Sequence, residues 1–380
     1  GYLRACNQLL VHGKAPPLAV LYRAASLLDD AASLASLHYH QPPQPNWPLL
    51  LDVYLLAHQL QLDRQPGAGK HGAPDLSDTV HARFFTALLT AICDPHHHRP
   101  GQIRAWHEWL LHNTDELALT TLPQGNASIP VDISGALTPL AAARTAKPGE
   151  HTRYVVTDPL REALATDPEA PSGLRETLDE LLRGRRSPDQ RQAPRQTRNH
   201  PYRLLFGLYP IAQRLLSLSG DTDRPPPAGS DARQVNQSKT GAAFVLPGTL
   251  QTPLAVGEPI LAEAEAVASN GATVGFLARI QRVMIEPGRQ IEIGVEKLPG
   301  RIMPVTISGS ASERLRGDTT ALLLHRPDIG GFVLIASRRV FREGEIVNVE
   351  GPSVRHSLRM RTQLTATPRL SYIDVEVAQT

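Results

Sequence analysis

The chain has 380 residues, 41% of them hydrophobic and 20% charged, which is a globular composition, and its formal net charge at pH 7 is +2. A chain of this length exceeds what one hydrophobic core usually serves, so two or three domains are expected. The nearly neutral charge argues against a protein that binds nucleic acid through its overall charge, and any basic site must be local.

The compartment is suggested by what the sequence lacks. Only two cysteines are present, Cys6 and Cys93, so there is no disulfide framework and no Cys-x-x-Cys pair for a metal. No uninterrupted apolar stretch approaches the ~20 residues that span a bilayer, and no secretory signal is visible. A reducing cytoplasm fits these features best, and no membrane span is expected.

The first part of the chain reads as helices. Residues 2–65 carry leucines at mixed spacings of three and four, residues 78–92 form a strongly amphipathic segment, and residues 100–119 continue the pattern. Short β-branched runs at 128–133 and 153–157 predict a pair of strands or a small sheet. Helices are predicted again at 158–164 and at 172–182, where Ser172 is a plausible N-cap. Residues 1–182 are therefore expected to form one mainly helical domain with a few strands.

Two patterns in this part could suggest chemistry. The loop Gly67-Ala-Gly69-Lys70-His71 lacks the first glycine and the Ser or Thr of a phosphate-binding loop, and no strand precedes it. The adjacent histidines His96, His97 and His98 cannot all converge on one ion, because metal ligands are normally spaced along rigid elements. With no nucleophile elbow or paired-carboxylate signature either, the sequence predicts a protein that is not an enzyme and that holds no metal and no cofactor.

Residues 183–200 form a segment rich in Arg, Gln and Pro that reads as a linker. It contains Arg191, Arg195 and Arg198. It could be a solvated basic hinge. It could also fold over a ligand, because two arginines four residues apart carry planar guanidinium groups suited to phosphate oxygens and to stacking on a flat base.

The segment Asn236-Gln-Ser238-Lys-Thr-Gly241 is the most specific in the chain. In extended backbone, Asn236 and Ser238 are alternate residues whose side chains leave one face together, where they could read a base edge. Gly241 supplies a position without Cβ, suited to a sharp turn or to the close approach of a ligand.

The rest of the chain is predicted to be β-rich. A helix-like piece at 208–218 precedes about six short strands between 235 and 308, which suit a closed barrel. About five more strands, at 321–324, 331–336, 345–349, 357–365 and 369–377, predict a second β-domain or an extension of the barrel over residues 309–380. Five arginines of this part are expected to be solvent-facing strand residues: Arg338, Arg339, Arg355, Arg359 and Arg361.

Together these segments resemble a known family. The pair Arg191-Gln-Ala-Pro-Arg195 and then Asn236-Gln-Ser238-Lys-Thr-Gly241 is similar to the RxxxR and [D/N]xSxxG signature of PilZ domains, bacterial β-barrels that bind cyclic di-GMP. The resemblance covers roughly residues 190–305 and includes the stretches around Gly257, Gly275 and Gly294. It implies that Arg191 and Arg195 grip guanines and phosphates, and that Asn236, Ser238 and Gly241 line a guanine pocket.

One feature departs from the family pattern: Asn236 lies 41 positions after Arg195, a longer spacing than usual. Arg198 could replace either arginine of the pair. The fold class expected is an α+β multidomain protein, with a mainly helical domain at 1–182, a linker at 183–200, a PilZ-like antiparallel barrel at 201–308 and further strands at 309–380.

The function implied is a cytoplasmic bacterial cyclic di-GMP receptor. Capture of the dinucleotide between the linker and the barrel would rearrange the domains and alter the binding of a protein partner through the helical domain. The alternative is a PilZ-like adaptor that binds proteins but not nucleotide.

Overall fold

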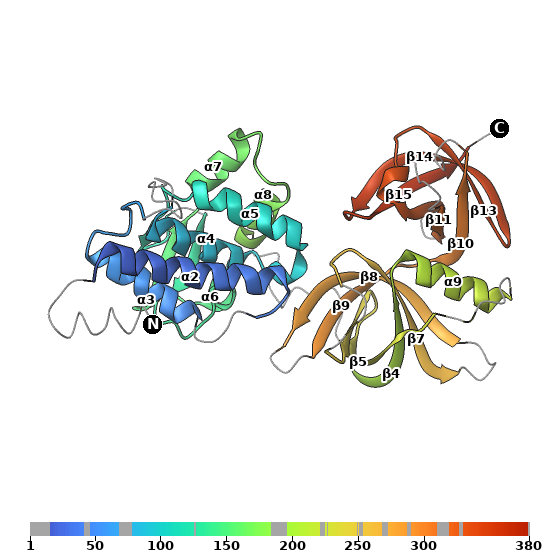
Figure 1. The fold of residues 1–380 in the computed structure, drawn as a ribbon, viewed down its shortest axis with the longest axis horizontal. Coiled ribbons are helices and arrows are strands. Elements are labelled where there is room, and N and C mark those ends of the chain that lie inside the picture. The colour runs from blue at the N-terminus through green and yellow to red at the C-terminus, as the bar shows by residue number, and fades with distance from the viewer. Residues whose placement is uncertain are drawn as a thin grey trace. The chain divides into compact units, whose positions relative to one another are not determined.

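The computed structural model describes residues 16–41, 46–67, 78–124, 127–183, 196–220, 225, 227–248, 250, 254–267, 273–286, 290–309, 319–326 and 330–378. The chain separates into two compact units, Gly1–Gln192 and Ala193–Thr380. The first unit is mainly helical and the second consists of β-barrels (Figure 1), which confirms the expected α+β multidomain class.

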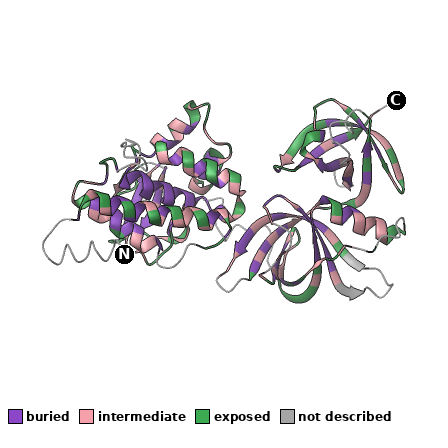
Figure 2. Ribbon diagram, in the orientation of Figure 1, coloured by how far each residue is buried: buried purple, intermediate pink, exposed green. Residues whose placement is uncertain are grey.

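The first unit is built around one buried helix. Its larger helices are α2 (Leu18–Leu37), α3 (Asn46–Gln59), α4 (Val80–Ile92) and α5 (Pro100–His112). The prediction of a helix over 78–92 is confirmed, but α4 is buried on nearly every side, including polar residues such as Thr86 and Thr90. Burial in this unit is concentrated in its middle (Figure 2). The ring of Phe84 stacks on that of Tyr54 with centroids 4.0 Å apart.

A small sheet follows, in the order β1 (Leu119–Thr120), β3 (Thr152–Val156), β2 (Ser128–Asp132). The two predicted strands are confirmed, whereas the helix expected over 100–119 ends at His112. The Asn113 side chain donates a hydrogen bond of 2.8 Å to the Trp109 carbonyl, which satisfies a terminal acceptor of that helix. Three shorter helices complete the unit: α6 (Pro139–Thr145), α7 (Asp158–Thr166) and α8 (Leu174–Leu182).

One turn of this unit differs from the predicted helix cap, and another holds a hydrogen-bonded carboxylate. The N-cap of α8 is Gly173, with φ +82°, and not Ser172. At the end of β2, the Asp132 carboxylate accepts hydrogen bonds from the Ser134 and Leu137 backbone amides and from the Ser134 hydroxyl. Burial alone would raise the pKa of Asp132, but these hydrogen bonds hold the pKa below its usual value.

The second unit contains two closed six-stranded antiparallel barrels. The first has the order β4-β5-β6-β9-β8-β7 and the strands β4 (Gln196–Phe206), β5 (Ser230–Gln237), β6 (Gly241–Leu246), β7 (Pro259–Val267), β8 (Thr273–Ile285) and β9 (Ile291–Lys297). The second has the order β10-β11-β12-β15-β14-β13 and the strands β10 (Arg301–Ser308), β11 (Thr320–Arg326), β12 (Gly331–Ser337), β13 (Ile346–Gly351), β14 (Val354–Ala366) and β15 (Leu370–Val377).

The strands divide the chain differently from the expected ranges. β4 begins at Gln196, inside the segment that the sequence analysis assigned to the linker. This start was missed because the first six residues of the strand are exposed and polar. β10 pairs with β11 and β13 and so belongs to the second barrel rather than to the first. The C-terminal strands therefore form a barrel of their own. Arg338 and Arg339 lie in a 3-10 helix, η2 (Arg338–Val340), and not in a strand.

The two barrels pack together through the helix α9 (Leu208–Ser219), which follows β4 and contacts β10 and β11 (Figure 1). Ile211 of α9 belongs to a buried cluster that also contains Leu261 of the first barrel and Leu322 of the second. The Tyr372 hydroxyl of β15 donates a hydrogen bond of 3.0 Å to the Gly257 carbonyl. The second unit thus has a continuous apolar contact between its barrels. Among the described helices of the whole chain, none is both long and apolar enough to cross a membrane.

Candidate functional site

The turn between β5 and β6 holds the three residues singled out in the sequence. Asn236 lies on β5, half-buried, and pairs with Thr197 of β4 on one side and Ala243 of β6 on the other. Ser238 lies just beyond the strand, where its backbone amide donates to the Gly241 carbonyl at 2.8 Å. The Ser238 hydroxyl in turn accepts from the Gly241 amide at 3.1 Å. The serine therefore holds the turn closed as well as bordering it.

Gly241 is required by a close approach between strands. A Cβ at this position would lie 2.8 Å from the carbonyl oxygen of Val295 on β9, which is closer than real Cβ atoms come. The glycine thus lets β6 lie tightly against β9 at the turn, and a side chain there would push the two strands apart.

The start of β4 lies beside this turn. Gln196 pairs with Gln237 and Thr197 with Asn236, so the end of the arginine-rich segment meets the Asn-Ser-Gly segment by direct strand pairing. The 40 residues between Arg195 and Asn236 consist largely of β4, α9 and the connection to β5. The described residues that follow Arg195 thus return to the turn despite the long spacing.

Of the three arginines, only Arg198 is among the described residues. It is exposed, lies in the irregular part of β4 between Thr197 and His200, and donates a hydrogen bond of 2.6 Å to the Gln196 side chain. Arg191 and Arg195 lie outside the described residues. Arg195 immediately precedes Gln196, the first residue of β4.

Charged side chains continue from the turn across the barrel. Gly241 pairs with Glu296 of β9, and Glu296 pairs with Arg279 of β8. The Glu296 carboxylate accepts hydrogen bonds from Arg279 at 2.7 Å and from the Gln281 side chain at 2.6 Å. The Arg279 guanidinium also lies 5.7 Å from the centroid of the Tyr372 ring in the second barrel. The sequence analysis gave Arg279 and Glu296 no role.

The interior of the same barrel end is aromatic. The rings of Tyr202, Phe244 and Phe276 contact one another, with centroids 5.3 to 6.3 Å apart. The Lys297 ammonium lies 4.9 Å from the Phe276 centroid, and burial lowers the pKa of Lys297. Burial likewise raises the pKa of Tyr202, although the charge of Arg198 opposes this shift.

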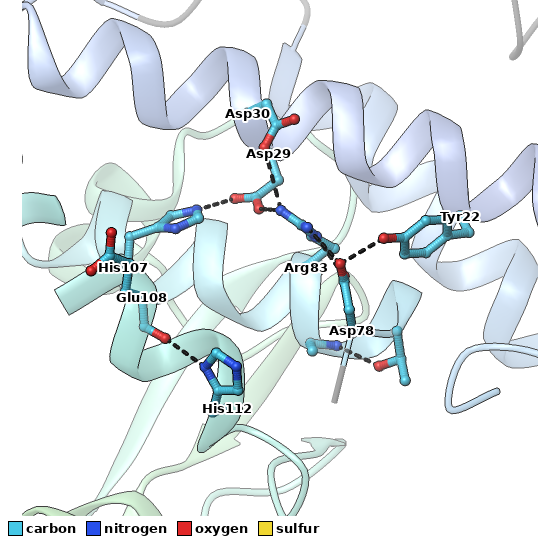
Figure 3. Close-up of polar contacts among 10 residues, drawn as sticks. Tyr22, Asp29, Asp30, Asp78, Arg83, His107, Glu108 and His112 are labelled. Carbon is cyan, nitrogen blue, oxygen red and sulfur yellow. Dashed lines mark hydrogen bonds and ion pairs between the residues drawn. The ribbon is translucent and has the colours of Figure 1, made fainter. Parts of the chain in front are cut away.

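A separate polar cluster lies in the helical unit (Figure 3). Arg83 of α4 forms two hydrogen bonds of 2.7 Å with the Asp78 carboxylate and one of 3.0 Å with Asp29 of α2. Asp29 also contacts His107 of α5 at 2.9 Å, and the Tyr22 hydroxyl donates to Asp78 at 2.6 Å. Burial, with the neighbouring Asp78 carboxylate, raises the pKa of Tyr22 to about 12.

This cluster ties three helices together and reads as structural. Every strong donor in it already has an acceptor, and the one exposed carboxylate, Asp30, completes the contacts of Arg83 at 3.3 Å. The described part of the chain contains no group of three or more potential metal ligands. Of the loop Gly67 to His71, only Gly67 is described, and the others lie outside the described residues.

The comparison with models of protein families finds a match within the helical unit. Residues 1–124 match a family model described as the N-terminal domain of the cyclic-di-GMP receptor FimW. This range contains the Arg83 cluster and ends before the barrels. No curated protein matches the chain.

Solved structures give only distant similarities. One is MrkH, titled a novel c-di-GMP-dependent transcription regulatory factor, with 7% identity over 50% of this chain and 88% of that chain and a TM-score of 0.17. Another is the PlzA protein of Borreliella burgdorferi in complex with c-di-GMP, with 8% identity, coverages of 47% and 81% and a TM-score of 0.17. Scores of this size carry no argument about this chain.

Proposed function

We propose that this protein is a cyclic di-GMP receptor whose ligand binds the first barrel at the β5–β6 turn. Arg191 and Arg195 hold guanine faces and phosphates, with Arg198 able to serve in place of either. Asn236, Ser238 and Gly241 form the barrel side of the site. The protein binds its ligand without catalysing a reaction, and it acts in the cytoplasm.

The observation that carries this proposal is the pairing of β4 with β5. Because Gln196 lies opposite Gln237, the residue after Arg195 is fixed next to the turn that holds Ser238. This pairing supports a site in which the arginines that precede β4 act together with the turn. The match of residues 1–124 to the FimW receptor model supports the same function from the other unit, independently of the barrel.

The chemistry of these residues suits a cyclic dinucleotide. Guanidinium groups form charge-assisted, bidentate hydrogen bonds with phosphate oxygens and stack on aromatic bases, so a pair of arginines can engage both parts of the ligand. The barrel side offers the half-buried Asn236 amide, whose donors and acceptor suit a base edge.

Ligand binding would be passed on through the segment between α8, which ends at Leu182, and β4. Holding Arg191 and Arg195 on the ligand would order this segment against the barrel and change the arrangement of the two units. A protein partner that binds the helical unit would respond to that change. Fluorescence energy transfer between a dye on each unit should change on addition of cyclic di-GMP, and should not change in the Arg195→Ala variant.

The direct test is calorimetric titration of cyclic di-GMP into the intact protein. Saturable binding is expected in the wild type, and it should be weakened in Arg195→Ala and in Ser238→Ala. The matched controls are Arg359→Ala, an exposed arginine of the second barrel, and Ser219→Ala at the end of α9, both of which should bind as the wild type does.

Absence of binding by calorimetry and by a second method would refute the receptor function. It would leave the adaptor function, in which the barrel binds a protein and not a nucleotide.

A further inference from the structure

A short segment that follows β12 is anchored to the second barrel by its apolar residues. Val340 of η2 is fully buried in the core of this barrel, and the half-buried Phe341 packs against the same core. The three arginines of the segment, Arg338, Arg339 and Arg342, are exposed. Because the apolar side chains hold the segment from inside, this part of the chain presents its arginines to solvent on an anchored backbone.

A fourth exposed arginine lies beside this segment. Arg369 belongs to the turn between β14 and β15, and its carbonyl accepts a hydrogen bond of 2.8 Å from the Arg338 amide. The turn is held by the buried Thr367, whose hydroxyl accepts a hydrogen bond of 2.8 Å from the Leu370 amide. Arg338 and Arg342 are four residues apart, so their Cα atoms are separated by at most ~14 Å. The four arginines therefore form one basic patch, which consists of Arg338, Arg339, Arg342 and Arg369.

The basic patch differs from other arginines of the second barrel because it has no carboxylate partners. Three arginines of β14 each face a carboxylate, in the pairs Arg355–Glu350, Arg359–Glu376 and Arg361–Asp374. Within the described part of the chain, no carboxylate forms an ion pair with a side chain of the basic patch. The acidic residues of the segment 338–345 are Glu343 and Glu345, so the segment and Arg369 together carry four arginines against two glutamates. The patch is therefore a local excess of positive charge.

The ligand that suits the basic patch is a row of phosphates. Arginine guanidinium groups form charge-assisted, bidentate hydrogen bonds with phosphate oxygens. Duplex DNA carries one phosphate charge per ~1.7 Å of its axis, so a patch of this length can meet several phosphates at once. Because the net charge of the whole chain is only +2, the attraction would come from the patch and not from the protein as a whole.

Two other kinds of anionic partner need side chains that the basic patch lacks. A basic segment that lies on a membrane also inserts apolar side chains into the lipid boundary, but Val340 is buried in the barrel core and Phe341 packs against that core. A single-stranded nucleic acid stacks its bases on aromatic rings, and the patch consists of arginines alone. The backbone of a duplex therefore fits the patch best.

We propose that the basic patch is a docking surface for the phosphate backbone of duplex DNA, which it binds without reading the base sequence. Contacts with phosphates fix a protein on the duplex but carry no sequence information. This inference goes beyond the proposed function and does not depend on it, because the patch lies on the second barrel and the β5–β6 turn lies on the first. It also agrees with the expectation from the nearly neutral chain that any basic site is local.

The test is fluorescence anisotropy of a labelled DNA duplex of mixed sequence, titrated with the full-length protein at several salt concentrations. If each arginine of the patch neutralises one phosphate, the logarithm of the association constant should fall with the logarithm of the salt concentration with a slope of about −3.6. The affinity should then drop roughly 150-fold between ~50 and ~200 mM salt. Each single alanine substitution should bring the slope about 0.9 closer to zero. Replacement of all four arginines by alanine should abolish binding.

Two variants make the test specific. Arg355→Ala removes an exposed arginine of the same barrel that already contacts Glu350, so the slope and the affinity should stay at the wild-type values. Arg339→Lys keeps the positive charge, so the slope should also stay, whereas Arg339→Ala should change it. All the substituted positions are exposed, and circular dichroism would show that the barrels remain folded.

Three results would overturn the inference. The first is that the wild type does not bind the duplex even at low salt. The second is that the variant without the four arginines binds the duplex with an unchanged slope. The third is that the wild type binds vesicles of phosphatidylcholine and phosphatidylserine through the patch but does not bind the duplex. The variant without the four arginines should still bind cyclic di-GMP as the wild type does, so this inference and the proposed function can fail independently.

Discussion

Removal of Arg83 should destabilise the helical unit severely. The guanidinium has a side-chain exposure of 8% and bridges Asp29, which is fully buried, and Asp78, which is 14% exposed. Replacement of Arg83 by methionine keeps much of the volume but leaves these two carboxylates without their cationic partner. Breaking a buried ion pair in this way costs about 3–5 kcal/mol, because the Asp29 carboxylate stays fully buried and keeps only its contact with His107 at 2.9 Å.

The ion pair of Arg83 with Asp30 adds little to this loss of stability. Its side chain is 53% exposed, and a pair of that kind contributes about 0–1 kcal/mol after screening by solvent. For a unit of 150–250 residues, each kcal/mol shifts the melting temperature by about 2–4 °C, so Arg83→Met should melt roughly 6–20 °C below the wild type.

The sequence provides a probe that reports on this unit alone. All three tryptophans, Trp47, Trp106 and Trp109, lie in the helical unit, so intrinsic tryptophan fluorescence follows its unfolding within the full-length protein. The measurement is urea and thermal unfolding of wild type and Arg83→Met by this signal.

The matched control is Arg161→Met. Arg161 also faces two carboxylates, Asp158 and Asp179, but its side chain is 37% exposed, so the expected loss is about 0–1 kcal/mol. A loss for Arg83→Met no greater than that of the control would refute the reasoning, because it would show that burial of the carboxylates carries no penalty.

Three further outcomes are expected. Asp132→Asn should lower the unfolding free energy by about 1 kcal/mol at pH 7. The pKa of Asp132 is lower in the folded state than in the unfolded state, so the stability difference between variant and wild type should be complete above the unfolded-state pKa of ~3.9. It should vanish as the pH falls through the folded-state pKa. Gly300→Ala should destabilise the second barrel by roughly 1–3 kcal/mol, since φ is +129° and a Cβ would collide with a β11 carbonyl; circular dichroism would measure this, with Gly330→Ala, at φ +62° in open space, as the milder control. Tyr372→Phe should cost about 0.5–1.5 kcal/mol by the same method, because it removes a buried hydrogen bond between the barrels.

Local patterns predicted the elements of this protein better than their pairing. The helix over 78–92 and the strands near 128–133 and 153–157 follow from periodicity and β-branched composition, which are properties of neighbouring residues. The start of β4 could not be recognised in this way, because residues such as Thr197 and Arg198 are exposed on a strand that buries only its last residues. The assignment of β10 depends on partners that lie far along the chain.

The residues of the candidate site likewise include some that local sequence patterns reveal and some that depend on strand pairing. Ser238 and Gly241 are visible in the sequence because a turn imposes its chemistry within a few residues. The contact of Arg279 with Glu296 is not visible in the sequence, because it depends on how β8 pairs with β9, and these two strands shift their register between Ile280 and Arg282.

The charged row beside the turn gives the second barrel a direct connection to the site. Gly241, Glu296 and Arg279 are consecutive register partners, and the Arg279 guanidinium is shared between the Glu296 carboxylate and the face of the Tyr372 ring. Because the Tyr372 hydroxyl is also bonded to Gly257 in the first barrel, this aromatic ring is held from two sides. A short chain of polar contacts therefore joins the turn to the second barrel, while the apolar packing of α9 keeps the two barrels together.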